Sequence, residues 1–240
     1  MKETYEAGAR DGAHREPLNI KAALIDMDGT LLDSMPSHAR AWQRMVSELG
    51  IDCGLDEFFG YEGMTGAATI DLIFRRELGR PATEQEKTEL YARKTGYFNE
   101  LPRVPVMPGA ARMLDFLREK GIKRVLVTGS GQKSTIGRLA GEFPGAFEEG
   151  MMVTSRDVSR GKPDPEPYLL AMSKAGVLPS EAMVVENAPL GVKAGAASGA
   201  FTVAVTTGPI PEQDMWDAGA DMVFPSMEAF ADALPGLLGN

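Results

Sequence analysis

The chain has a single cysteine, Cys53, among its 240 residues. One thiol cannot form an internal disulfide, and it excludes a zinc site built from several cysteines. Histidine is almost as scarce, because the chain contains only His14 and His38. This leaves few candidates for a Ser–His–Asp triad, and His14 lies in a polar segment at the start of the chain.

Long apolar runs and an excess of basic residues are also missing. No run approaches the ~20 residues of a membrane span, and the first twenty residues contain no apolar leader. Lys and Arg number 25 against 34 Asp and Glu, so the net charge is −9 and the isoelectric point is near 4.9. This balance disfavours nucleic acids as partners but not small anions, because one metal ion or lysine reverses the local field. We expect a soluble cytoplasmic protein, a monomer, with no membrane or nucleic-acid partner.

Apolar strand-like runs alternate with segments of helical period along most of the chain. The run at 22–25 is apolar at every position, which is typical of a central parallel strand covered by helices on both faces. Further strands are expected, with helices between them, at 124–127, 151–154, 183–185, 201–205 and, as an edge strand, 221–224. The alternation predicts an α/β fold with a doubly wound parallel sheet and an active site at the carboxyl ends of its strands.

Residues 34–101 interrupt this alternation with helical periods throughout, and a capping box is expected at 83–86. The apolar stripes of this segment are Trp42, Met45, Val46 and Leu49, then Ile70, Ile73, Phe74 and Leu78. The segment begins and ends at the rim of the expected active site, which favours a lid. We therefore predict a weakly ordered polar tail at 1–17, a catalytic core at 18–33 and 102–240, and a helical cap at 34–101.

Two carboxylates, Asp26 and Asp28, follow the first strand, and Gly29 allows the chain to turn sharply after them. Such close carboxylates repel unless a cation or a proton lies between them. One of them can act as a nucleophile while the other exchanges protons with the leaving group. The alternative is an ordinary Asp-Gly turn, which is common after strands.

Polar groups also follow the later strands. Thr128 offers a hydroxyl, and the backbone N–H groups of Gly129 and Ser130 can form a phosphate nest, although Thr128 is equally suited to cap a helix. Lys162 lies in a loop stiffened by a glycine and prolines, where it can face an anion or simply be solvated. The pair Glu186-Asn187 ends a strand with oxygen ligands that suit Mg²⁺, or forms a turn.

These four sites, in this order, resemble the haloacid dehalogenase superfamily of phosphohydrolases and mutases. The resemblance covers the whole chain after the tail. It implies that Asp26 is a nucleophile that forms an aspartyl-phosphate and that Asp28 is a general acid and then a base. It further implies that Thr128 binds the transferring phosphoryl group, that Lys162 neutralises charge, and that Mg²⁺ binds between Asp26, the Asp28 carbonyl and the Glu186-Asn187 turn. Charge compensation and in-line placement are what phosphoryl transfer requires.

The segments 37–42 and 161–168 resemble the β-phosphoglucomutase-like subfamily, whose mutases hold a second phosphate with basic cap residues. Here Glu62 and Gly66 stand where basic residues are expected, which disfavours mutase activity. The fourth site has Asn187 in place of a second carboxylate, and Glu62 on a closing cap would restore that charge at the metal. This combination resembles the inorganic pyrophosphatases of the subfamily. The alternative for Glu62 is a solvated loop residue.

The sequence therefore predicts a Mg²⁺-dependent phosphohydrolase acting on a small phosphorylated substrate, with inorganic pyrophosphate as the first candidate. A sugar-phosphate phosphatase or a β-phosphoglucomutase-type phosphotransferase is the alternative. A phosphate-binding protein with a vestigial site is a third reading, disfavoured by the complete set of catalytic residues. The predicted metal ligands are Asp26, Asp28, Asn187 and Glu62. The predicted substrate contacts are Asp26, Met27, Asp28, Glu62, Thr128, Gly129, Ser130 and Lys162.

Overall fold

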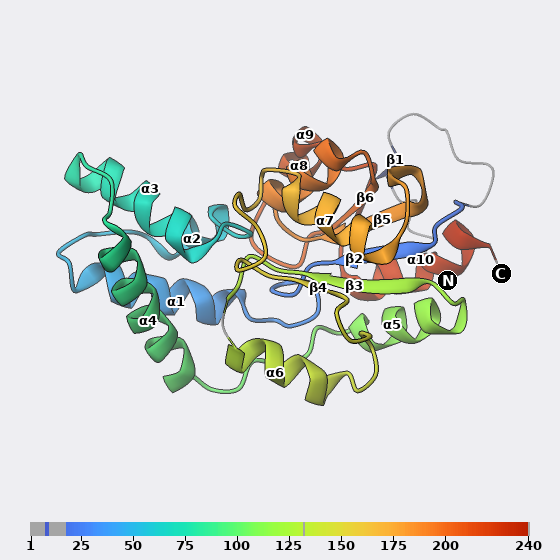
Figure 1. The fold of residues 1–240 in the computed structure, drawn as a ribbon, viewed down its shortest axis with the longest axis horizontal. Helices are drawn as coiled ribbons and strands as arrows, with labels where there is room; N and C mark the ends of the chain where they lie inside the picture. Colours follow the sequence, from blue (N-terminus) through green and yellow to red (C-terminus); the bar gives the residue numbers. More distant parts are fainter. Residues whose placement is uncertain (1–7, 10–17, 132, 240) are drawn as a thin grey trace, which may run out of the picture.

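A single sheet organises the described part of the chain, residues 8–9, 18–131 and 133–239 of a computed structural model. The strand order is β1-β7-β6-β5-β2-β3-β4, and every neighbouring pair is parallel except β1 with β7. The strands are β1 Gly8–Ala9, β2 Ala22–Ile25, β3 Lys123–Val127, β4 Met152–Val153, β5 Ala182–Glu186, β6 Phe201–Val205 and β7 Met222–Phe224. The predicted doubly wound α/β fold is confirmed (Figure 1).

Helices cover both faces of the sheet, which explains why β2 is apolar at every position. Ala23 and Ile25 belong to a core shared with α5, α6 and α10, whereas Ala22 and Leu24 belong to one shared with α7 and α8. The helices around the sheet are α5 Ala110–Glu119, α6 Lys133–Glu142, α7 Glu166–Ala175, α8 Pro189–Ser198, α9 Glu212–Ala218 and α10 Met227–Leu238, with a 3₁₀ turn at Pro179–Glu181. Alternate side chains of one strand therefore enter opposite layers.

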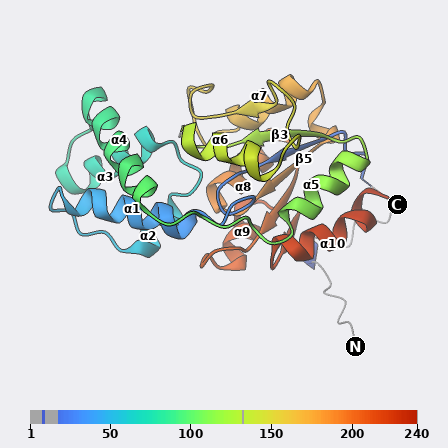
Figure 2. The same ribbon diagram turned by 90° about the horizontal axis from the view of Figure 1, so that it is seen from below.

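Four further helices lie beside the sheet rather than on it (Figures 1 and 2). They are α1 Met35–Ser47, α2 Leu55–Gly60, α3 Gly66–Leu78 and α4 Glu84–Glu100, and we call residues 34–101 the helical module. The module has its own apolar core around Trp42, Phe58 and Ile73. The predicted capping box is confirmed, because Thr83 and Glu86 each accept a hydrogen bond from the other's backbone N–H.

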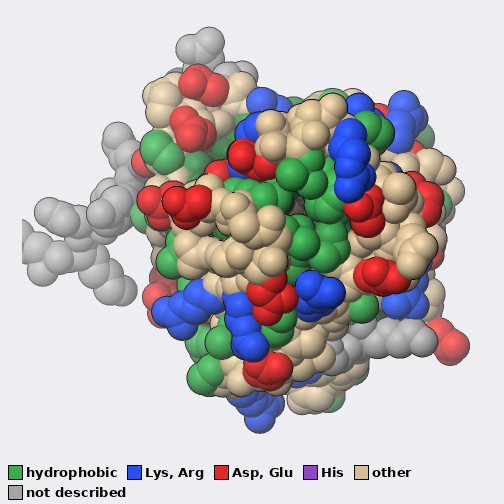
Figure 3. Space-filling view, turned by 90° about the vertical axis from the view of Figure 1, so that its left-hand side faces the viewer, with side chains coloured by type: hydrophobic (Ala, Val, Ile, Leu, Met, Phe, Trp, Pro, Cys, Tyr) green, Lys and Arg blue, Asp and Glu red, His purple; other side chains and the backbone are tan. Residues whose placement is uncertain are grey.

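Two residues assigned to the predicted apolar stripes are exposed, so the prediction that they are buried is wrong. Leu49 lies past the end of α1 and is 36% exposed, and Leu78 is 46% exposed at the last position of α3. Helical periodicity assigns them to a buried face, but the turns at the helix ends carry them away from it. Figure 3 looks onto the module and shows hydrophobic side chains at its surface between charged ones.

The start of the chain also differs from the sequence prediction. The predicted tail, 1–17, lies outside the described residues except for Gly8 and Ala9, which pair with Val223 and Met222 as β1. The segment 221–224 was expected at the sheet edge, but β1 covers β7 on that side. Backbone pairing needs no apolar side chains, so composition cannot reveal it. Among the described residues, no helix is long and apolar enough to cross a membrane.

Candidate active site

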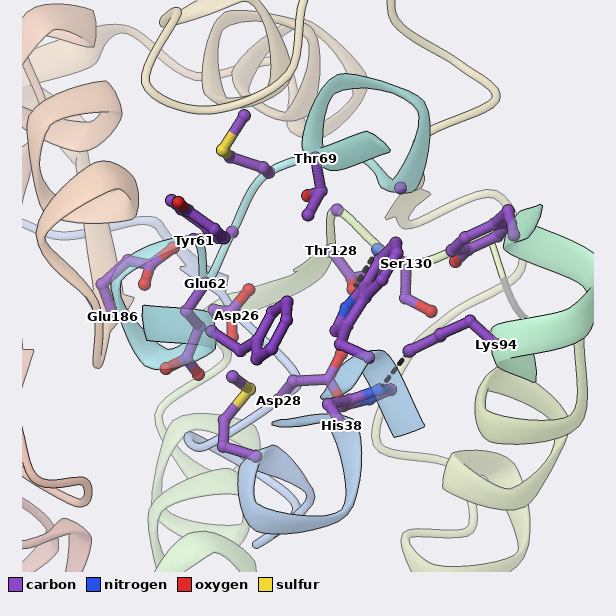
Figure 4. Close-up of a pocket in the computed structure, with 18 residues that line it drawn as sticks. Asp26, Asp28, His38, Tyr61, Glu62, Thr69, Lys94, Thr128, Ser130 and Glu186 are labelled. Atoms are coloured by element: carbon purple, nitrogen blue, oxygen red, sulfur yellow. Dashed lines mark hydrogen bonds and ion pairs between the residues drawn. The ribbon is translucent and has the colours of Figure 1, made fainter. Parts of the chain in front are cut away.

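The carboxyl ends of three adjacent strands bring the predicted residues together (Figure 4). Strand β2 lies between β3 and β5, with Ile25 opposite Leu126 and Val185. Asp26 follows β2 directly, Thr128 follows β3, and Glu186 is the last residue of β5. The parallel register therefore places these side chains at one edge, although they are up to 160 positions apart in the sequence.

Lys162 connects two of these carboxylates. It comes from the loop between β4 and α7, and its Nζ donates to Asp26 Oδ1 at 2.5 Å, to Glu186 Oε1, and to the carbonyl of Val127 at 3.2 Å. Burial would by itself lower the pKa of Lys162, but Asp26 and then Glu186 outweigh it and raise it. The alternative of a solvated surface lysine is wrong, because Lys162 is only 3% exposed.

Glu186 is fully engaged by its neighbours. Besides Lys162, the hydroxyl of Tyr168 donates to Oε1 at 2.6 Å, and the backbone N–H groups of Asn187 and Ala188 donate to Oε2 at 3.0 and 3.4 Å. Tyr168 is completely buried. Because both oxygens already accept hydrogen bonds, Glu186 is suited to holding Lys162 in place beside Asp26.

Asp28 has a separate environment from Asp26. Its Oδ1 accepts a hydrogen bond from Ser34 at 2.5 Å and contacts His38 Nε2 at 3.1 Å. Burial would by itself raise the pKa of Asp28, but His38, Ser34 and Lys94 outweigh it and lower the pKa. For Asp26, burial raises the pKa and Lys162 only partly opposes the rise. These directions make Asp28 the ionised group, which is able to accept a proton, so the assignment of Asp26 as nucleophile depends on its contact with Lys162 and on the resemblance, not on its pKa.

Lys94 continues the contact chain from Asp28 into the helical module. Its Nζ lies 2.6 Å from His38 Nδ1, and it is 2% exposed among the rings of Trp42, Tyr91 and Phe98. Burial and then Lys94 lower the pKa of His38, so the neutral ring accepts at Nδ1 and donates from Nε2 to Asp28.

Lys94 is not among the residues predicted from the sequence, although the sequence contains a signal for it. Lys94 lies four residues after Leu90, which is buried in the apolar core of the module on the same helix. A lysine at that spacing on an apolar stripe is a buried charge, and buried charges need a specific reason.

Glu62 comes from the loop between α2 and α3 of the module. It is 7% exposed, and its Oε1 accepts a hydrogen bond from Asn187 Nδ2 at 2.6 Å. Burial raises the pKa of Glu62 well above its ordinary value, with Asn187 opposing and Asp26 adding to the rise. The alternative of a solvated loop residue is therefore wrong, and the module brings a carboxylate to the carboxyl edge of the sheet.

The loop after β3 holds the residues of the predicted phosphate nest, and one of its N–H groups is already bonded within the loop. Thr128 is buried, and its Oγ1 accepts a hydrogen bond from the N–H of Ser130 at 3.0 Å. Thr128, Gly129 and Ser130 line a cavity together with Asp26. Met27 does not line it, because its side chain is completely buried in the core under the sheet. Its predicted substrate contact is thus limited to its backbone, since consecutive residues of extended chain point to opposite sides.

The cavity lies between the sheet edge and the helical module and has a volume of about 60 Å³. The module contributes most of its aromatic wall, and Lys94 is the one Lys or Arg among the described lining residues. The lining residues are Asp26, Asp28, Met35, His38, Trp42, Phe58, Tyr61, Glu62, Gly63, Met64, Gly66, Thr69, Tyr91, Lys94, Thr128, Gly129, Ser130 and Glu186.

Several known proteins are similar to this chain in sequence or in fold. The family model of the haloacid dehalogenase-like hydrolases matches residues 20–199. Hexitol phosphatase A of Escherichia coli (strain K12) is 31% identical over 188 residues, which cover 78% of this chain and 84% of that protein. Beta-phosphoglucomutase of Bacillus subtilis (strain 168) is 28% identical, over 85% of this chain and 88% of that protein. A solved structure from Bacteroides vulgatus, provisionally named a beta-phosphoglucomutase, is 45% identical with a TM-score of 0.88, over 94% and 93% of the two chains.

Proposed function

The chain belongs to the haloacid dehalogenase-like hydrolases, and from this premise we propose that it hydrolyses small phosphate compounds through a phosphorylated Asp26. The observation that carries the proposal is the separation of the two carboxylates. Asp26 is paired with Lys162, whereas Asp28 is held by Ser34 and His38. This is the division of labour that a nucleophile and a proton-transfer group require.

The proposed reaction has two steps. In the first, a carboxylate oxygen of Asp26 attacks phosphorus, the bond to the leaving-group oxygen breaks, and Asp28 supplies the proton to that oxygen. In the second, Asp28 takes a proton from water, the resulting hydroxide attacks the same phosphorus, and Asp26 leaves as a carboxylate. Lys162, the Thr128 hydroxyl and the N–H group of Gly129 compensate the charge of the phosphoryl oxygens in both steps.

We further propose Mg²⁺ as the cofactor, and the charges of the site support a divalent cation. Four buried or half-buried carboxyl groups, Asp26, Asp28, Glu62 and Glu186, face the ammonium of Lys162 and the amine of Lys94, whose pKa is lowered to about 7. Among the described residues no three His, Cys, Asp or Glu side chains converge on one point. The proposed ligands are accordingly mixed, namely the carboxylates of Asp26 and Glu62, the carbonyl of Asp28 and the amide oxygen of Asn187. Such all-oxygen sets suit Mg²⁺, which would neutralise charge on the phosphoryl group.

A sugar or polyol phosphate is the substrate class that the relatives favour. The hexitol phosphatase named above acts on such a compound by its name, and a phosphatase of Thermotoga maritima named for phosphorylated carbohydrates is 29% identical over 75% of this chain. In this chain, Thr69 and Lys94 place polar groups beside the aromatic rings on the module side of the cavity. Phosphoryl transfer to a second sugar position is disfavoured, because Lys94 alone of the described lining cations could hold a second phosphate and it contacts His38.

Inorganic pyrophosphate is a second candidate, and the contact between Glu62 and Asn187 favours it. A carboxylate so close to a reacting phosphate repels it unless a cation lies between them. Pyrophosphate carries more charge than a monoester and is bound with its own metal ion, so an additional carboxylate from the module has a clear role. The small cavity also suits a leaving group without carbon atoms.

The test is a phosphate-release panel containing a hexitol phosphate, hexose phosphates, pyrophosphate and p-nitrophenyl phosphate, each with Mg²⁺ and with EDTA. A tenfold preference for a sugar or polyol phosphate supports the first candidate, and the same preference for pyrophosphate supports the second. Glu62→Ala should then raise the Mg²⁺ concentration for half-maximal pyrophosphate hydrolysis, while Asp56→Asn, exposed on the same module, should not. Absence of turnover on every compound would refute the hydrolase proposal.

A further inference from the structure

The loop of the helical module that carries Glu62 lies directly against the loops at the sheet edge. We call residues 62–65 the contact segment. At one end, Glu62 contacts Asn187 after β5. Farther along, a Cβ placed on Gly63 would lie 3.1 Å from the side chain of Lys162. The segment therefore reaches two of the loops that carry proposed catalytic residues.

Gly129 in the phosphate-nest loop allows the closest of these approaches. A Cβ at this position would lie 2.5 Å from the carbonyl oxygen of Gly63 and 2.8 Å from that of Met64. These are backbone atoms, so they cannot move aside as a flexible side chain can. The backbone of Gly129 is not in the left-handed region. Only the approach of the contact segment, and no local conformation, requires glycine here.

Gly161, next to Lys162, has the same relation to the end of the contact segment. A Cβ there would lie 2.7 Å from Cγ2 of Thr65. Thr65 has little freedom to turn away, because its Oγ1 accepts a hydrogen bond from the N–H of Ala68 and caps α3. Gly161 also has a backbone that any residue could adopt. Gly129 and Gly161, which lie in different loops of the sheet, thus both pack against the contact segment.

We infer that Gly129 and Gly161 are specificity-determining residues that limit the size of the leaving group. Without side chains at these positions, the contact segment can lie against the loops around Asp26, and the cavity keeps its volume of about 60 Å³. Sites for drug-sized ligands have roughly 300–1,000 Å³. A methyl group at either position would hold the module back by roughly 1 Å, enlarge the cavity and displace Glu62. This inference rests on the proposed hydrolase function and adds the determinant of its selectivity.

The experiment compares Gly129→Ala and Gly161→Ala with two matched controls. Gly96→Ala in α4 and Gly137→Ala in α6 place the same methyl group where no atom lies within 4 Å. In the test variants, kcat/KM for the best small substrate should fall about 10- to 100-fold, because a 1 Å misplacement has effects of that size. The fall should be at least tenfold smaller for p-nitrophenyl phosphate. Both controls should keep the wild-type ratio of the two substrates.

A rescue separates steric closure from a direct effect on phosphate binding. Thr65→Ser removes Cγ2, which the new methyl of Gly161→Ala would meet, and keeps the hydroxyl that caps α3. The double variant Gly161→Ala/Thr65→Ser should recover most of the lost kcat/KM. Failure to recover it would overturn the steric argument at Gly161.

Hydrogen exchange gives a readout that does not depend on turnover. In Gly129→Ala, peptides covering 61–66 should exchange faster than in the wild type, whereas β2, β3 and β5 should be unchanged. If the wild type hydrolyses nothing in the panel, the proposed function fails. Hydrogen exchange alone then tests whether the contact segment packs against Gly129. Unchanged exchange at 61–66, or an unchanged substrate ratio in an active enzyme, would overturn the inference.

Discussion

The buried amine of Lys94 should make the stability of the folded protein depend on pH in the alkaline range. Burial lowers the pKa of Lys94 to about 7, with only Asp28 opposing, whereas its ordinary value is 10.5. The unfolded chain therefore binds more protons than the folded protein between these two values. Under that condition the free energy of unfolding rises with pH. Lys94→Met keeps most of the side-chain volume and removes the titrating group.

The size of the effect follows from the two pKa values. Within the window the slope approaches about 1.4 kcal/mol per pH unit for one proton. From pH 7.5 to pH 9 the wild type should gain about 2 kcal/mol from this group, relative to Lys94→Met. In a domain of this size that corresponds to a relative shift in melting temperature of roughly 4–8 °C.

The assay is urea unfolding followed by circular dichroism at several pH values from 7.5 to 9.5. The quantity of interest is the difference in unfolding free energy between wild type and Lys94→Met, because groups remote from Lys94 titrate alike in both proteins. The lowered pKa values of its neighbours Asp28 and His38 lie below this pH range. Lys193→Met is the matched control, since Lys193 is exposed on α8. A difference that is constant with pH would show that the amine of Lys94 is not buried as described, and the contact chain to Asp28 would lose its support.

Four further substitutions test Asp26 and the residues around it. Asp26→Asn should abolish steady-state phosphate release while circular dichroism stays unchanged, and Asp28→Asn should lower kcat by ~10²–10⁴-fold, as is typical for a proton-transfer group. Residual turnover near the wild-type level would refute either role. Lys162→Met should remove activity and also cost about 3–5 kcal/mol of unfolding free energy in urea, because it leaves Asp26 and Glu186 buried without a cation beside them. If Asp26→Asn in the same chain restores none of that stability, the ion pair is not its source. Tyr168→Phe should cost about 1–2 kcal/mol, since Glu186 loses one donor, and an unchanged midpoint in urea would contradict that contact.

The strand ends were the part of the site that the sequence could reveal. The run at 22–25 is apolar at every position and stops at Asp26, and β5 stops in the same way at Glu186. In a parallel sheet such stops share one edge, so their proximity in space follows from the order of elements alone. The sequence cannot say how the hydrogen bonds divide among them. That Glu186 is occupied by Lys162 and Tyr168, leaving Asn187 to meet Glu62, depends on long-range contacts.

The contributions of the helical module were harder to predict, for a physical reason. Helical periodicity defines which face of a helix is buried, but it does not say what covers that face. Lys94 is on a buried face and could not be placed beside His38 without the packing of α4 on α1. Glu62 is in a loop, where no periodicity exists, and only its charge at an unusual position indicated a role. Residues whose function depends on contacts between the helical module and the loops of the sheet are therefore the hardest to identify from a single sequence.

The site is divided between the loops of the sheet and the helical module, and this division affects which substrate is selected. The loops of the sheet provide Asp26, Thr128 and Lys162, which in the proposed reaction act on the phosphoryl group and do not contact the group attached to it. The module provides Glu62, Lys94 and the aromatic wall of the cavity, which in the proposed function contact the leaving group or the metal. Differences in substrate among relatives that share the loops should therefore lie in the module. Exchanging residues 34–101 for those of a related sugar-phosphate phosphatase should transfer the substrate preference and leave the dependence on Asp26 unchanged.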